Sequence, residues 1–162
     1  MKTNVEIISD LEQFTTWVEG LKAHNHQLMF KPIAEGKWSI AEILSHIMFW
    51  DRYILKEMIP NMKQDADLST IEFQELNDKA AEYALSGVSF EFLLEELIES
   101  RKKLVSYLRG KTDEEFTVSF KINGDAVDNY TGYPFTLYNY ICDFIWHDNH
   151  HKKQMEEFLS KM

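Results

Sequence analysis

The feature that most constrains this sequence is a histidine cluster in a long helical pattern near the C-terminus, Trp146-His147-Asp148-Asn149-His150-His151. Residues four apart lie close together on one face of an α-helix, so His147 and His151 can direct their imidazoles at one point. His150 comes three residues after His147 and points to the other side of that pair. His147 and His151 also share the apolar stripe of this segment, which comprises Leu137, Tyr140, Ile141, Phe144, Met155 and Phe158. The spacing predicts a two-ligand metal clamp on a core-facing helix.

A metal held by protein usually needs at least three ligands, and His46 is the best candidate for the third. It lies in a second helical pattern, where Ile43, Ile47 and Trp50 indicate that its imidazole faces the core. That segment is far from His147 in the sequence, so the two residues can meet only through the packing of helices. A buried imidazole pair needs polar partners, and a divalent metal satisfies both at once. The residues leave a second interpretation open, in which each histidine is a hydrogen-bonded packing residue.

No fourth ligand and no catalytic residue can be assigned from the sequence. Glu42, Asp51 and Asp148 are candidate ligands by position. Each is instead expected to face solvent or to hydrogen-bond to one of the metal-binding residues. Structural metal sites are normally closed by four protein ligands, whereas three ligands leave a position open and favour catalysis. Cys142 lies in an apolar helical segment and is expected to be a buried, inert thiol.

The remaining patterns predict an all-α protein. Only 3 prolines and 6 glycines interrupt the 162 residues, alternating strand patterns are scarce, and hydrophobic residues make up 44% of the chain, which is enough for a sizeable core. No repeat or inter-domain linker is visible, so a single domain over residues 1–162 is expected. We predict a four-helix up-and-down bundle, with the last helix beside the second and a short extended excursion before the last helix.

The first two helices are expected to begin at capping boxes, in which a Ser or Thr and a Glu three residues later satisfy the first backbone groups. Ser9-Asp10-Leu11-Glu12 predicts a helix that ends near His26. Ser39-Ile40-Ala41-Glu42 predicts a second helix that continues to residues 58–59, before Pro60 ends it.

Three further helices are expected, the first of them an outer or shorter element. Ser69 or Thr70 caps the third, with inward residues Ile71, Phe73, Leu76, Ala80, Tyr83 and Ala84. The fourth covers residues 89–110, and its solvated face comprises Glu95, Glu96, Glu99, Arg101, Lys102 and Lys103. The last begins near Thr136, and between these two helices Asn123-Gly124 predicts a tight turn in the extended excursion.

Charge and composition argue against several kinds of partner. The chain has 27 acidic and 17 basic residues, a formal charge of −10, so neither nucleic acid nor an anionic membrane surface is an expected partner. No segment approaches the ~18 apolar residues of a membrane helix. The first residues lack the apolar run of a signal peptide, and the single cysteine fits a reducing compartment, so a cytoplasmic protein is expected.

Several familiar catalytic motifs are missing from the sequence. The chain has no Gly-rich phosphate loop, no Cys-x-x-Cys pair, no Gly-x-Ser-x-Gly elbow and no His-Glu-x-x-His motif. Metalloprotease chemistry of the His-Glu-x-x-His kind is therefore not predicted.

Two motifs resemble those of the DinB superfamily, also called the DinB/YfiT-like metalloprotein fold. The first is Lys37-Trp38-Ser39-Ile40-Ala41-Glu42-Ile43-Leu44-Ser45-His46, and the second is His147-x-x-His150-His151-x-x-Gln154. Helix order and chain length also agree with that family. The resemblance implies a four-helix bundle, commonly a homodimer, with one divalent metal bound by three histidines that map onto His46, His147 and His151.

The resemblance further implies a function for that metal. Such sites are found with nickel or zinc, and manganese or iron is less expected with all-nitrogen ligands. Characterised relatives include transferases that use bacillithiol, mycothiol or glutathione, so a metal-dependent thiol-S-transferase in stress response or detoxification is expected here. The alternatives are a metal-dependent hydrolase of a small substrate and a non-catalytic module stabilised by the metal. Gln154 could orient His150 or a bound ligand, or it could be a surface amide.

Overall fold

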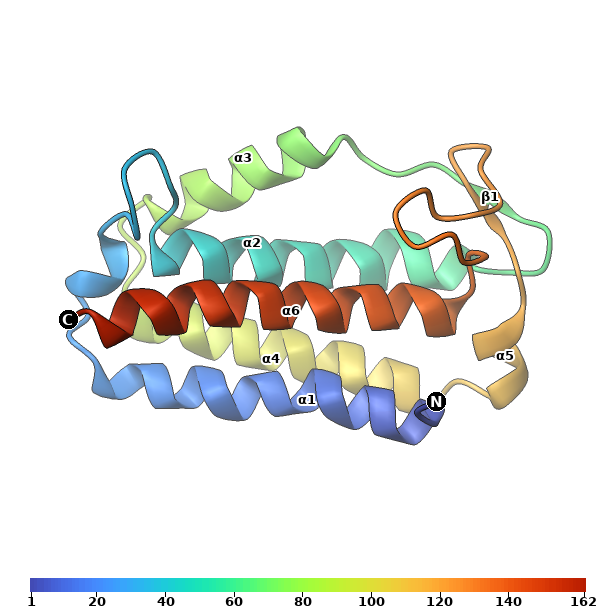
Figure 1. Ribbon diagram of the computed structural model, residues 1–162, viewed down its shortest axis with the longest axis horizontal. Coiled ribbons are helices and arrows are strands. Elements are labelled where there is room, and N and C mark those ends of the chain that lie inside the picture. Colours follow the sequence, from blue (N-terminus) through green and yellow to red (C-terminus); the bar gives the residue numbers. More distant parts are fainter.

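The computed structural model describes residues 1–162 and contains six α-helices, four of which form a bundle. The bundle helices are α1 (Asn4–Gly20), α2 (Ile40–Tyr53), α4 (Phe90–Arg109) and α6 (Leu137–Ser160). Helices α1 and α6 run in one direction and α2 and α4 in the other (Figure 1). The predicted all-α four-helix bundle is confirmed, but its helices do not alternate strictly up and down along the chain, because a further helix carries the chain back between α2 and α4.

The two remaining helices lie outside the bundle. Helix α3 (Phe73–Ala84) packs against α2 on the side away from α1, and it returns the chain so that α2 and α4 run parallel (Figure 1). Helix α5 (Asp113–Thr117) lies at one end of the bundle. None of the helices is both long and apolar enough to cross a membrane.

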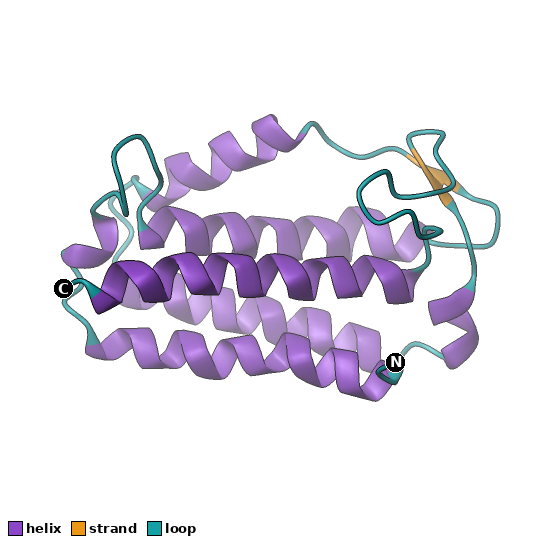
Figure 2. Cartoon of the chain, viewed as in Figure 1, coloured by secondary structure: helices purple, strands orange, loops and turns teal.

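The extended excursion before α6 is confirmed, and it contributes to the only pair of strands. Strand β1 (Asp67–Leu68) pairs in parallel with β2 (Lys121–Ile122), as Figure 2 shows beside the loops at that end of the molecule. The predicted Asn123-Gly124 turn follows β2, and both residues have positive φ angles, 51° and 84°. Asn and Gly tolerate this backbone conformation better than other residues, which explains why they occupy the turn.

The start of α1 corrects the prediction from the sequence. The helix begins five residues before the Ser9-Asp10-Leu11-Glu12 motif, at Asn4, because Thr3 and Glu6 form the capping box that is used. The Thr3 hydroxyl accepts from the Glu6 backbone, and the Glu6 carboxylate accepts from the Thr3 backbone, both at 3.1 Å. The α-helix ends at Gly20, ahead of the predicted end, and a short 3₁₀ turn follows it.

The other helix starts agree with the sequence, with one exception. Ser39, Ser89 and Thr136 cap α2, α4 and α6 as predicted. Beyond Tyr53 the second helix continues as a π-helical segment and then a 3₁₀ turn. Helix α3 begins later than predicted, after Glu72, and its first residue, Phe73, is 60% exposed instead of facing inward.

The core consists of two apolar clusters separated by a layer of charge. One cluster fills the half of the bundle around Leu44, Leu97 and Met155, and the other fills the half around Ile54 and Leu108. Between the two, the buried Arg101 guanidinium contacts carboxylates from α2 and α6. One cation therefore connects the bundle helices at mid-height.

The position of Arg101 corrects the prediction that it belongs to the solvated face of α4. Its side chain has no exposed surface, and it donates to both oxygens of Asp51 at 2.7 and 3.0 Å and of Asp148 at 2.7 and 3.1 Å. It also donates to the Leu11 carbonyl at 2.9 Å. Arg101 lies four residues after Leu97 and therefore on the apolar stripe, which is the sequence signal for its burial. A buried charge is tolerated only when it is paired, and this one is paired twice.

Candidate metal centre

The structure brings together the three histidines that the sequence singles out. His46 comes from the middle of α2, and His147 and His151 come from successive turns of α6. The Nε2 atom of His147 lies 3.1 Å from Nε2 of His46 and 3.0 Å from Nε2 of His151. His46 is buried, whereas His147 and His151 are half-buried, so the cluster reaches the surface on the α6 side.

The orientation of His46 is set by Asn77, a residue of α3 that the sequence did not single out. Asn77 Oδ1 accepts hydrogen bonds from Trp50 Nε1 at 3.0 Å and from His46 Nδ1 at 2.8 Å. Because an indole nitrogen can only donate, the Trp50 contact requires an oxygen at this position of the amide. His46 Nδ1 therefore carries its proton, and its Nε2 atom presents a lone pair to the cluster.

His151 is oriented in the same way by Gln154. Gln154 Oε1 accepts from His151 Nδ1 at 2.8 Å, which leaves the Nε2 lone pair of His151 directed at His147. Gln154 thus contacts His151, which corrects the expectation that it orients His150. His150 is exposed and stacks on Trp146 with ring centroids 5.3 Å apart, outside the cluster.

The resulting arrangement fits a divalent metal. The lone pairs of His46 and His151 both meet His147 Nε2, which can donate a single proton, so hydrogen bonding within the cluster does not satisfy all three nitrogens. One ligand atom from each histidine lies within 4.8 Å of the others. Ligand nitrogens around a tetrahedral zinc ion at about 2.05 Å are about 3.3 Å apart, close to the two shorter separations observed. A metal among the three Nε2 atoms would satisfy every lone pair.

The electrostatics of the cluster keep the imidazoles neutral. Burial, followed by the proximity of His151, lowers the pKa of His46 to about 4. Burial, followed by the proximity of His151 and His46, lowers the pKa of His147 to about 3. The pKa of His151 is also lowered, mainly by burial. Neutral imidazoles are the form that binds metals, so no proton has to leave these residues near neutral pH.

The carboxylates considered as a fourth ligand are all engaged elsewhere. Asp51 and Asp148 are buried and both pair with Arg101, so they do not face solvent as expected. Glu42 accepts from the Ser39 backbone and hydroxyl in the capping box of α2. Three nitrogen ligands without a protein carboxylate leave coordination positions open.

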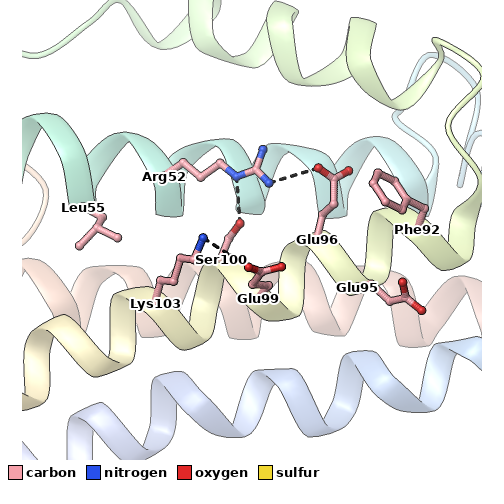
Figure 3. A pocket seen from close by; sticks show the side chains of 8 residues that line it. All are labelled: Arg52, Leu55, Phe92, Glu95, Glu96, Glu99, Ser100 and Lys103. Atoms are coloured by element: carbon pink, nitrogen blue, oxygen red, sulfur yellow. Dashed lines mark hydrogen bonds and ion pairs between the residues drawn. The ribbon is translucent and has the colours of Figure 1, made fainter.

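The single cysteine and a surface hollow are not part of the histidine cluster. Cys142 is half-buried instead of fully buried, and burial raises the pKa of its thiol, which disfavours a nucleophilic thiolate. A hollow of about 350 Å³ lies between α2 and α4, where Arg52 donates to Ser100 and Glu96 (Figure 3). Arg52 pairs with Glu96 and Lys103 with Glu99 in this hollow, and no histidine lines it.

Comparison with known proteins identifies the family. The sequence pattern that describes the DinB superfamily matches residues 10–155. The chain belongs to the DinB superfamily. The resemblance seen in the two histidine motifs is therefore confirmed, although no protein of curated function matches this DinB-superfamily chain.

Solved structures share the fold at low sequence identity. YfiT from Bacillus subtilis, described as a probable metal-dependent hydrolase with an unusual four-helix bundle topology, is 17% identical with a TM-score of 0.72, and the match covers 98% of this chain and 87% of YfiT. The colibactin self-resistance protein ClbS, solved in complex with double-stranded DNA, is 19% identical with a TM-score of 0.66, and the match covers 97% and 94% of the two chains. An uncharacterised protein from Clostridium difficile 630 is 16% identical with a TM-score of 0.63, over 94% and 97%.

Proposed function

We propose that this DinB-superfamily protein is a metal-dependent enzyme in which His46, His147 and His151 hold one divalent ion, zinc or nickel, that activates a small nucleophile. The observation that carries the proposal is the convergence of three Nε2 atoms at a half-buried position. The description of YfiT as a probable metal-dependent hydrolase supports metal dependence.

The absence of a fourth protein ligand favours catalysis over a structural role. Asp51, Asp148 and Glu42 are each held by other partners, and closed structural sites normally use four protein ligands. The half-buried His147 and His151 leave the cluster accessible from the surface, as a reaction with a small substrate requires.

The chain's own residues prepare the site in two ways. Asn77 and Gln154 fix the ring orientations and tautomers of His46 and His151, so their Nε2 atoms face the metal position before it is filled. Burial keeps the imidazoles neutral. A divalent ion bound by neutral imidazoles retains its positive charge and lowers the pKa of water or of a thiol at neutral pH.

The nucleophile comes from outside the protein in this proposal. Cys142 has a raised pKa and is not one of the cluster residues, so it does not fill that role. A low-molecular-weight thiol of the bacillithiol type is the first candidate, because characterised members of the family that the histidine motifs resemble include thiol-S-transferases. Water is the second candidate, favoured by the description of YfiT.

The experiment that tests this proposal gives the zinc- or nickel-loaded protein two kinds of substrate. A chlorinated arene or an epoxide is supplied with bacillithiol, mycothiol or glutathione in turn, and an activated ester is supplied with water alone. Thiol-dependent turnover that His151→Ala abolishes while its helix content persists would support the transferase. Ester hydrolysis with the same dependence would support the hydrolase. If metal removal leaves every activity unchanged but lowers the melting temperature, the metal is structural and the proposal is wrong.

The partners and the cellular location of the protein are also proposed, from its charge, its family resemblance and its single cysteine. The net charge of −10 disfavours a phosphate backbone, so we do not extend the DNA complex of ClbS to this chain. A homodimer and a cytoplasmic location fit the family resemblance and the single cysteine. Light scattering at micromolar concentration and fluorescence anisotropy with labelled duplex DNA would test the dimer and the absence of DNA binding.

A further inference from the structure

A strip of aromatic rings connects the candidate metal centre to the surface. Phe144 lies one turn before His147 on α6, with ring centroids 6.3 Å apart, and it contacts Tyr140 at 5.1 Å and Trp50 of α2 at 6.5 Å. Trp50 in turn contacts Phe73 of α3 at 5.2 Å. We call Trp50, Phe73, Tyr140 and Phe144 the aromatic strip.

The strip is joined to the histidines by a polar contact as well as by packing. The indole nitrogen of Trp50 donates to Asn77 Oδ1, the same atom that accepts from His46 Nδ1. The two central rings of the strip are therefore linked to the histidines, Trp50 to His46 through Asn77 and Phe144 to His147 by ring packing. A molecule held at the histidines would lie next to Phe144, and the other rings of the strip extend from there through Trp50 to Phe73.

The strip combines exposed and buried rings. Phe73 is 60% exposed, and Tyr140 and Phe144 are half-buried, whereas Trp50 beneath them is only 8% exposed. The rings come from three different helices, α2, α3 and α6, with Trp50 between the flanking rings of α3 and α6. Exposed aromatic surface next to a polar site is typical of ligand-binding surfaces, where rings supply apolar contact and a few polar groups fix orientation.

We propose that the substrate of this site carries an aromatic or similarly flat apolar group, which packs on the aromatic strip while a polar group of the substrate reaches the metal at the histidines. This inference rests on the proposed function and adds the chemical class of the substrate to it. Ring stacking and burial of apolar surface would supply the preference.

Binding of two metal-directed probes to the zinc-loaded protein tests the inference without requiring an activity. Benzohydroxamate and acetohydroxamate share one metal-binding group and differ in the phenyl ring. Titration calorimetry should show benzohydroxamate binding about tenfold more tightly. Phe73→Ala should lower the affinity for benzohydroxamate about fivefold and leave that for acetohydroxamate unchanged. Because Phe73 is largely exposed, helix content by circular dichroism should not change.

Phe92→Ala is the matched control. Phe92 is 52% exposed in the first turn of α4 and lines the hollow between α2 and α4 (Figure 3), which has no histidine in its lining. Its loss should change neither affinity. Equal affinities for the two probes would overturn the aromatic-substrate inference alone. So would a benzohydroxamate preference that Phe73→Ala leaves intact, or one that Phe92→Ala lowers as much as Phe73→Ala does. A protein that fails to hold zinc, or whose zinc binds neither probe, would overturn the proposed function as well.

Discussion

Asn77 accepts a hydrogen bond from Nδ1 of His46 at 2.8 Å and thereby connects the outer helix α3 to the candidate metal centre. Because Asn77 Oδ1 can only accept, the proton of the neutral imidazole stays on Nδ1, and the Nε2 lone pair of His46 points at His147. Replacing a residue that hydrogen-bonds to a metal-binding histidine typically lowers metal affinity by about 10- to 100-fold.

Replacing Asn77 with Ala should therefore weaken metal binding by roughly 10- to 100-fold. The loss follows because His46 can then rotate or adopt the other tautomer. Competition with a chromogenic chelator measures the dissociation constant. Asp78→Ala, an exposed neighbour on α3, serves as the control and should bind metal like the original protein. Equal affinity in the two variants would show that Asn77 does not position the ligand.

Gln154→Ala should weaken the site in the same way through His151, again by at least about tenfold. His150→Ala is the comparison, because that imidazole stacks on Trp146 at the surface and lies outside the cluster. The same chelator competition applies to both proteins. A larger loss in His150→Ala than in Gln154→Ala would mean that the metal uses the other histidine of α6.

The metal-free protein should lose stability as the pH falls from about 6.5 to about 4. The pKa of His46 is lowered to about 4 and that of His147 to about 3, whereas an unfolded chain has histidines near ~6.5. In that window the unfolded state binds more protons than the folded state, so acid favours unfolding. Urea unfolding in the presence of a chelator at pH 7.5 and pH 5 measures the difference. His46→Gln should reduce the dependence on pH, and an unchanged dependence would contradict the assignment.

Arg101→Met should destabilise the fold by about 3–5 kcal/mol, because it leaves Asp51 and Asp148 buried without their cation. Arg109→Met is the matched control, since Arg109 makes an exposed ion pair with Glu12, and its loss should cost less than about 1 kcal/mol. Chemical denaturation measures both. The triple variant Asp51→Asn, Arg101→Met, Asp148→Asn should recover part of the stability. Similar effects of the two single arginine variants would show that the buried layer contributes little.

Much of the fold could be predicted because local signals and helical periodicity determine it. The caps Ser39, Ser89 and Thr136 begin their helices where the sequence indicated. The start of α1 was missed because two Ser/Thr-x-x-Glu motifs follow each other, and periodicity does not decide between them. The apolar pattern predicts that Phe73 faces inward, but as the first residue of α3 it is 60% exposed.

The pairing of His147 with His151 could be predicted from their spacing and the inward position of His46 from its apolar stripe, but the role of Asn77 could not. Asn77 and Arg101 act through contacts with residues far away in the sequence, and a polar residue on one helix does not reveal its partner on another. Arg101 lay on the apolar stripe of α4, so its burial could have been found from periodicity. Its two aspartate partners depend on how α2, α4 and α6 pack.

Metal analysis of the protein purified without an affinity tag tests the central claim most directly. The account predicts one equivalent of a divalent ion, zinc or nickel, in the original protein and in His150→Ala. The metal should be absent from the His46→Ala, His147→Ala and His151→Ala proteins, provided that each keeps its helix content. A stoichiometric metal that persists in the His147→Ala protein, or an original protein that binds no divalent ion at neutral pH, would contradict the account.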